Sequence, residues 1–101
     1  MKLYYEKNEY LMDGTLAIRT WHDKDGHKVL YDDVSVNLTC YGMMPEEGHI
    51  FMPTYKMSPE YYQQIIDDIV EEVIRPVQIG LGTGVYVKLK DNWEEGVEMI
   101  E

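Results

Sequence analysis

The sequence of 101 residues is short and acidic, with 19 Asp and Glu against 9 Lys and Arg and a formal net charge of −10 at pH 7. Its length accommodates one domain, residues 1–101, and its 45% hydrophobic content is too high for a disordered acidic tail. Phosphate backbones and anionic membranes repel so negative a chain, which argues against direct nucleic-acid or membrane binding.

Alternating residues predict the first strands. Leu16, Ile18 and Thr20 alternate with Ala17, Arg19 and Trp21, the period of a half-buried strand, and the same period returns over residues 34–38. The Asp25-Gly26 pair between them favours a hairpin turn, so the two strands are expected to be antiparallel neighbours. Shorter strands are predicted at residues 3–5 and 50–52.

A helix is predicted over residues 59–74. Ser58 is a favourable N-cap, and Pro59 fits the first helical position, where no backbone donor is needed. Pro76 is expected to end the helix. A wide apolar stripe follows the helical spacing: Tyr61, Tyr62, Ile65, Ile66, Ile69, Val70, Val73 and Ile74.

The last predicted elements are a strand over residues 77–81, a glycine turn at Gly82-Thr83-Gly84 and a strand over 85–89. An acidic C-terminal segment follows at about residues 91–101. Strands on both sides of one amphipathic helix indicate an α+β domain. We therefore expect an antiparallel sheet of about five strands with the helix packed on one face.

The polar face of the predicted helix carries an uncompensated row of carboxylates. Asp67 with Glu71 and Asp68 with Glu72 are like-charge pairs four residues apart, which weaken a helix. Two interpretations stay open: a solvated face, or a row that meets a basic surface of another protein. The second interpretation predicts a partner-binding set of Asp67, Asp68, Glu71, Glu72 and Glu60.

The glycine turn also has two interpretations. It is either a tight connection that only glycine can make, or a cradle whose N–H groups bind a small nucleotide ligand. The ligand-binding hypothesis assigns stacking to an aromatic ring and charge pairing to two basic side chains. Its residues are Arg19, Gly82, Thr83, Gly84, Tyr86 and Lys88.

Histidine and cysteine form no motif that indicates catalysis or metal binding. His22, His27, His49 and Cys40 do not have the paired spacing of a zinc site. A single cysteine beside Tyr41 at a strand end is more typical of a small core residue than of a nucleophile. We expect no metal, no cofactor and no enzymatic activity.

The order of these features resembles a family of small proteins carried on bacterial mobile elements and phages. The resemblance covers Tyr10 to Leu89 and carries no catalytic residue to transfer. It rests on the run from Tyr10 to Ile18, the Asp25-Gly26 turn, the Val34 to Leu38 segment, the Pro45 to Phe51 segment, the helix and the Gly-Thr-Gly before a tyrosine-bearing strand. It implies an accessory gene of a mobile element, where small acidic proteins are often inhibitors of host defence.

The resulting functional prediction is a non-enzymatic, anti-defence inhibitor that binds a basic surface of a host protein through its acidic face. The alternative is a sequestering protein, or sponge, for a nucleotide-derived immune signal. The first residues contain no apolar run of signal-peptide length, and no stretch approaches the roughly 20 apolar residues of a membrane span. A cytoplasmic location is therefore expected.

A homodimer is also predicted. One helix covers one face of the sheet, and the open face would carry Trp21 and Ala17, with Tyr31 or Tyr86. Pairing through that face or through edge strands would remove this aromatic surface from water. The segment over residues 93–100 would then clasp the neighbouring copy.

Overall fold

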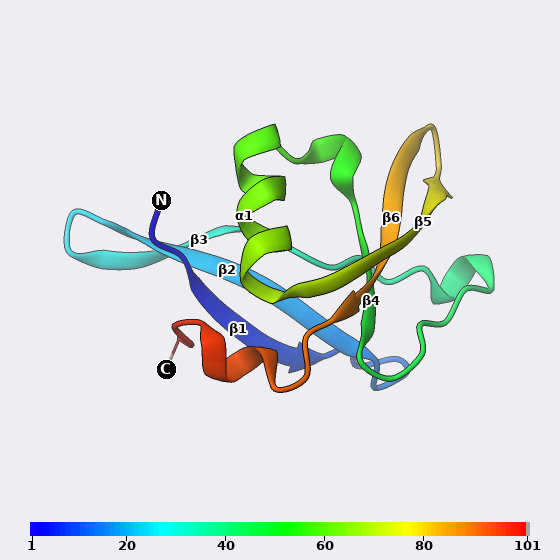
Figure 1. Ribbon diagram of the computed structural model, residues 1–101, viewed down its shortest axis with the longest axis horizontal. Coiled ribbons are helices and arrows are strands. Elements are labelled where there is room, and N and C mark those ends of the chain that lie inside the picture. Colours follow the sequence, from blue (N-terminus) through cyan, green and yellow to red (C-terminus); the bar gives the residue numbers. More distant parts are fainter. Residues whose placement is uncertain (101) are drawn as a thin grey trace.

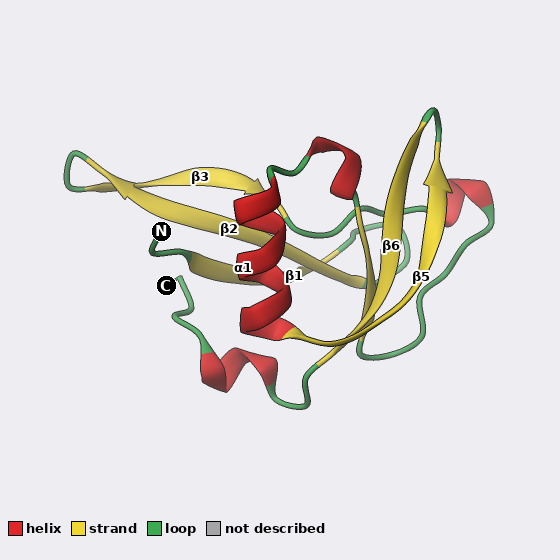
Figure 2. Ribbon diagram, turned by 45° about the horizontal axis from the view of Figure 1, so that its top comes forward, coloured by secondary structure: helices red, strands yellow, loops and turns green. Residues whose placement is uncertain are grey.

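Two small antiparallel sheets and one helix make up the computed structural model, which describes residues 1–100. The first sheet has the order β1-β2-β3, with β1 at Tyr4–Glu9, β2 at Leu16–Lys24 and β3 at His27–Asp33. The second has the order β4-β6-β5, with β4 at His49–Met52, β5 at Val70–Ile79 and β6 at Gly82–Leu89. The helix α1, Pro59–Ile69, lies over the first sheet with the β5–β6 hairpin beside it (Figures 1 and 2). The α+β class is confirmed, whereas the single sheet of about five strands is wrong.

The β2–β3 hairpin turns where the sequence predicts. Asp25 and Gly26 have φ values of 51° and 84°, the left-handed pair that a two-residue hairpin turn requires. However, this turn pairs Lys24 with His27, so the partner of β2 is His27–Asp33 and the predicted strand over 34–38 is wrong. That segment alternates because Val34 and Leu38 are buried in the core, and Val36 alone makes an isolated bridge, to Phe51.

The start of α1 is confirmed and its predicted end is wrong. The Ser58 hydroxyl accepts a 3.2 Å hydrogen bond from the Tyr61 N–H. Yet α1 ends at Ile69, and β5 begins directly at Val70 without a loop. The β-branched residues over 70–74 suit a strand, and there they pair with β6. Pro76 is tolerated because β5 is an edge strand.

The glycines predicted to form a turn lie inside β6. The turn is Gly80-Leu81, and Ile79 pairs with Gly82 across it. A Cβ at Gly84 would collide with the carbonyl oxygen of Met52 and lie 2.5 Å from the Ile79 side chain. Glycine is therefore required at this position by the close approach of β4, not by a turn.

The C-terminal segment packs on the first strand. Trp93, in the short 3-10 helix η3 at Trp93–Gly96, is buried with its ring centroid 6.2 Å from that of Tyr5. The Tyr5 N–H donates to the Glu98 carbonyl at 2.8 Å, and the Ile100 N–H donates to the Tyr5 carbonyl at 2.8 Å. Within the predicted acidic segment over 91–101, Trp93, Glu98 and Ile100 thus contact Tyr5 of β1. Glu101 lies outside the described residues.

The larger core lies where α1 meets both sheets. The buried side of α1 contributes Tyr61, Ile65 and Ile69, which pack with residues of both sheets and with Trp93. A smaller cluster in and beside the second sheet contains Leu38, Phe51, Val77 and Tyr86. No helix within residues 1–100 is long and apolar enough to cross a membrane.

Candidate functional site

The carboxylates predicted to share one helical face lie on two different elements. Glu60, Asp67 and Asp68 belong to α1, whereas Glu71 and Glu72 belong to β5. The single helical row is wrong, because the helix ends before Glu71. Glu60 lies in the first turn, about 10 Å along the helix axis from Asp67.

Four of these carboxylates nevertheless gather at the C-terminal end of α1. Asp67 and Asp68 line a hollow of about 260 Å³ together with Asp91 and Trp93. Close by, the Lys88 Nζ lies 3.0 Å from the Glu71 carboxylate. The hydrogen bond from Lys88 to Glu71 raises the pKa of Lys88, and Asp91 and Glu72 contribute further. We name this group the helix-end acidic surface: Asp67, Asp68, Glu71, Glu72 and Asp91.

Two lysines lie within this surface and leave it negative. Lys88 pairs with Glu71 in an exposed ion pair. The Lys90 ammonium donates to the backbone carbonyl of Asp67 at 2.7 Å, where it complements the negative end of the helix dipole. Five carboxylates therefore face two ammonium groups, and one of those is directed at backbone oxygens rather than at a carboxylate.

The helix carboxylates are held by side-chain hydrogen bonds. The Tyr5 hydroxyl donates to Asp68 at 2.8 Å, and the Gln63 amide donates to Asp67 at 2.9 Å. Burial raises the pKa of Tyr5, and the hydrogen bond to Asp68 raises it further, so the hydroxyl keeps its proton as a donor. Both carboxylates are therefore held in place by side chains of the protein itself.

The predicted nucleotide cradle is not formed. Gly82, Thr83, Gly84, Tyr86 and Lys88 lie along β6 rather than in a loop. The Gly84 backbone is covered by Met52, and the Tyr86 ring is buried against Phe51 with its hydroxyl accepting from the Glu46 N–H at 2.9 Å. Arg19 lies on β2 of the other sheet, where its guanidinium pairs with Glu6.

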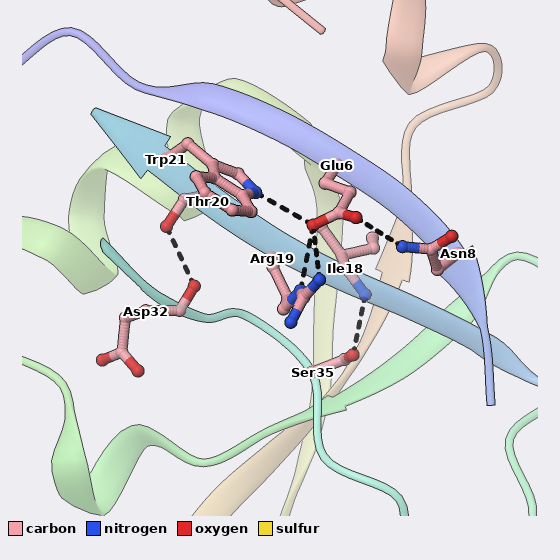
Figure 3. A network of polar contacts seen from close by, with 8 residues as sticks. All are labelled: Glu6, Asn8, Ile18, Arg19, Thr20, Trp21, Asp32 and Ser35. Atoms are coloured by element: carbon pink, nitrogen blue, oxygen red, sulfur yellow. Dashed lines mark hydrogen bonds and ion pairs between the residues drawn. The ribbon is translucent and has the colours of Figure 1, made fainter. Parts of the chain in front are cut away.

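Arg19 instead belongs to a polar network on the outer face of the first sheet (Figure 3). One Glu6 carboxylate oxygen accepts from the Arg19 guanidinium and from the Trp21 indole, each at 2.9 Å. The other oxygen accepts from the Asn8 amide at 2.7 Å. Chiefly through the Arg19 hydrogen bond, this network lowers the pKa of Glu6.

The predicted aromatic open face is therefore divided. Trp21 and Ala17 share the outer face of the first sheet, opposite the buried Ile18 and Thr20. Tyr31 instead packs against Tyr61 of α1, with ring centroids 5.1 Å apart. Tyr86 belongs to the second sheet.

One carboxylate that the sequence did not single out joins two loops. Asp13 accepts from the Thr15 N–H at 2.8 Å, from the Asn37 amide at 3.1 Å and from the Thr15 and Thr39 hydroxyls. The hydroxyls, that of Thr15 first, hold the pKa of Asp13 well below its ordinary value. Asp13 thus fastens the loop after β1 to the segment after β3.

Asp91 is the residue of the helix-end acidic surface that sequence reasoning placed only in the tail. In the sequence, only its position two residues after the end of β6 could have pointed to this role. That position was not enough, because α1 and β6 become neighbours only in the fold.

Among the described residues, no group of three or more His, Cys, Asp and Glu side chains could hold a metal ion.

Comparisons with protein-family models, curated proteins and solved structures give no match to this chain.

Proposed function

We propose that this protein is a non-enzymatic binding protein whose helix-end acidic surface docks on a basic surface of another protein. The gathering of five carboxylates around Lys88 and Lys90, from three separate parts of the chain, is the observation that carries the proposal. A solvated helix face needs no such convergence.

Electrostatics and geometry support this role in different ways. The net charge of −10 accelerates the approach of a basic partner and disfavours acidic ones. The hydrogen bonds from Tyr5 and Gln63 fix two carboxylates in advance, which lowers the ordering cost of docking.

The partner is proposed to be a host defence protein, and its basic surface a groove that binds nucleic acid. The resemblance to small proteins of phages and mobile elements supports this setting, in which the protein would act as an inhibitor in the host cytoplasm. Carboxylates presented in place of phosphates would then compete for the lysines and arginines of the groove.

The test is capture of a partner from host lysate by the wild-type chain and by two charge-matched variants. Asp67→Asn with Asp91→Asn removes two charges from the helix-end acidic surface. Glu60→Gln with Asp25→Asn removes two charges elsewhere, and Asn suits the positive φ of Asp25. Far-UV circular dichroism checks that all three chains are folded.

We expect mass spectrometry to identify a basic protein that the wild type and the Glu60/Asp25 variant retain and the Asp67/Asp91 variant loses. Equal loss by both variants would show that only the overall charge matters, and full retention by both would show that Asp67 and Asp91 are not needed. Either result would contradict the proposal. Capture of no basic protein by the wild type would count against the proposal directly.

A further inference from the structure

A second hollow, of about 530 Å³, adjoins the helix-end acidic surface, because Trp93 lines both. Its walls come from the end of β1, the loop between β1 and β2, and residues 45–49. Figure 1 shows the loop before β4 lying beside the loop that joins β1 and β2. Its volume is within the range of protein sites that hold small ligands.

The lining combines apolar and acidic residues. Leu16, Pro45 and Trp93 contribute apolar surface. The acidic residues of the lining are Glu9, Glu46 and Glu47, and no ion pair within residues 1–100 involves them.

The two basic side chains of the lining, Lys7 and His49, are already engaged. The Lys7 ammonium lies 2.6 Å from the carboxylate of Glu94. The His49 ring stacks on Tyr86, and its Nδ1 lies 2.9 Å from the Glu47 carbonyl oxygen. The hollow therefore has a surplus of negative charge beside apolar surface.

We propose that this hollow accepts an arginine side chain of the same basic partner. Its three-methylene stem would pack on Leu16, Pro45 and Trp93, and its guanidinium would meet the carboxylates of Glu9, Glu46 and Glu47. A carboxylate or phosphate ligand would meet the same three negative charges and be repelled. The inference rests on the proposed function and deepens it, because it names a specific anchor beside the acidic surface.

The probe is an acetylated and amidated peptide of alternating Gly and Arg, titrated into the ¹⁵N-labelled full chain. A peptide with citrulline in place of arginine keeps the shape and removes the charge. We expect saturable shifts of the amides over residues 14–16 and 46–49 and of the Trp93 indole with arginine, and none with citrulline. Saturable binding that leaves these signals unmoved, or equal binding of the citrulline peptide, would overturn the inference.

A charge-matched pair of variants tests the carboxylates. Glu9→Gln, Glu46→Gln and Glu47→Gln together should weaken binding of the arginine peptide about tenfold. Asp25→Asn, Glu60→Gln and Glu95→Gln remove the same charge from exposed positions outside the hollow and should leave the affinity within about twofold. An equal loss in both variants would reduce the effect to overall charge and overturn the site.

The experiments distinguish failure of the arginine site from failure of the proposed function. If the peptide shifts only signals of Asp67, Asp68 and Asp91, the hollow is not the arginine site, whereas the proposed function stands. If the peptide fills the hollow but the Asp67/Asp91 variant still captures the basic partner, the proposed function fails and the arginine site stands.

Discussion

The hydroxyl of Tyr5 donates a 2.8 Å hydrogen bond to the carboxylate of Asp68 and so joins the first strand to the last turn of α1. Tyr5 is 1% exposed, and its ring also meets that of Trp93. A core residue therefore sets the position of a surface carboxylate. Substitutions in the core beneath α1 are therefore expected to shift the position of the Asp68 carboxylate in the helix-end acidic surface.

Tyr5→Phe removes this hydrogen bond and keeps the buried ring. We expect a loss of about 1–2 kcal/mol in the free energy of unfolding, because a hydrogen bond to a charged group contributes about 1.5–3 kcal/mol and solvation of Asp68 reduces that contribution. Urea unfolding followed by circular dichroism measures it. Tyr62 lies in α1, and its hydroxyl makes no hydrogen bond within residues 1–100, so Tyr62→Phe should change stability less. Equal losses would mean that the Asp68 contact contributes nothing.

Asp13→Asn should remove the part of the pH dependence of stability that comes from the Asp13 carboxylate. The pKa of Asp13 is lowered in the folded chain, so its carboxylate stabilises the fold above the unfolded pKa of about 4. That contribution is lost as the pH falls through the folded pKa. The wild type should exceed the variant most near neutral pH, and the gap should narrow below about pH 4. Urea midpoints across this range measure the gap, and Asp25→Asn in the exposed hairpin turn is the control. A gap that is constant with pH would contradict the role of the Asp13 carboxylate.

Gly84→Ala tests the close approach of β4 and β6. The added methyl would overlap the Met52 carbonyl oxygen, so the strands must shift, at a cost of about 1–3 kcal/mol. At Gly96, by contrast, a Cβ would meet nothing within 4 Å. Gly96→Ala should therefore be close to neutral in the same thermal and urea unfolding experiments. Similar stability of the two variants would refute the packing argument.

Local signals in the sequence were reliable, and signals that depend on distant partners were not. The Asp25-Gly26 turn and the Ser58 cap depend on residues within three positions, and both were predicted correctly. The end of α1 was not, because Val70, Val73 and Ile74 fit a helical stripe as well as a strand. Pairing with β6 decides between the two, and nothing within residues 59–76 reveals it.

The same distinction applies to the candidate site. Gly84 was predicted to turn the chain, yet its need for glycine comes from Met52, far away in the sequence. The sequence predicted that carboxylates gather near α1, but the fold decides which carboxylates belong to the helix-end acidic surface. Asp91 enters it because β6 ends beside α1, and Glu60 leaves it because it lies in the first turn of the helix.

The fold limits the predicted homodimer interface to the outer face of the first sheet. Trp21 and Ala17 remain together on the outer face of the first sheet, whereas the segment over residues 98–100 is bonded to its own β1. We expect light scattering to give twice the 11.9 kDa chain mass, and Trp21→Lys to halve it. A monomer throughout the micromolar range would contradict the dimer.

The contact between β1 and the C-terminal segment has a consequence for biosynthesis. Tyr5 leaves the ribosome well before its edge partners Glu98 and Ile100 and its ring partner Trp93. The outer edge of the first sheet therefore stays unpaired until residues 93–100 have been synthesised. During that interval β1 is exposed to pairing with another nascent chain, and its protection depends on how quickly residues 93–100 follow.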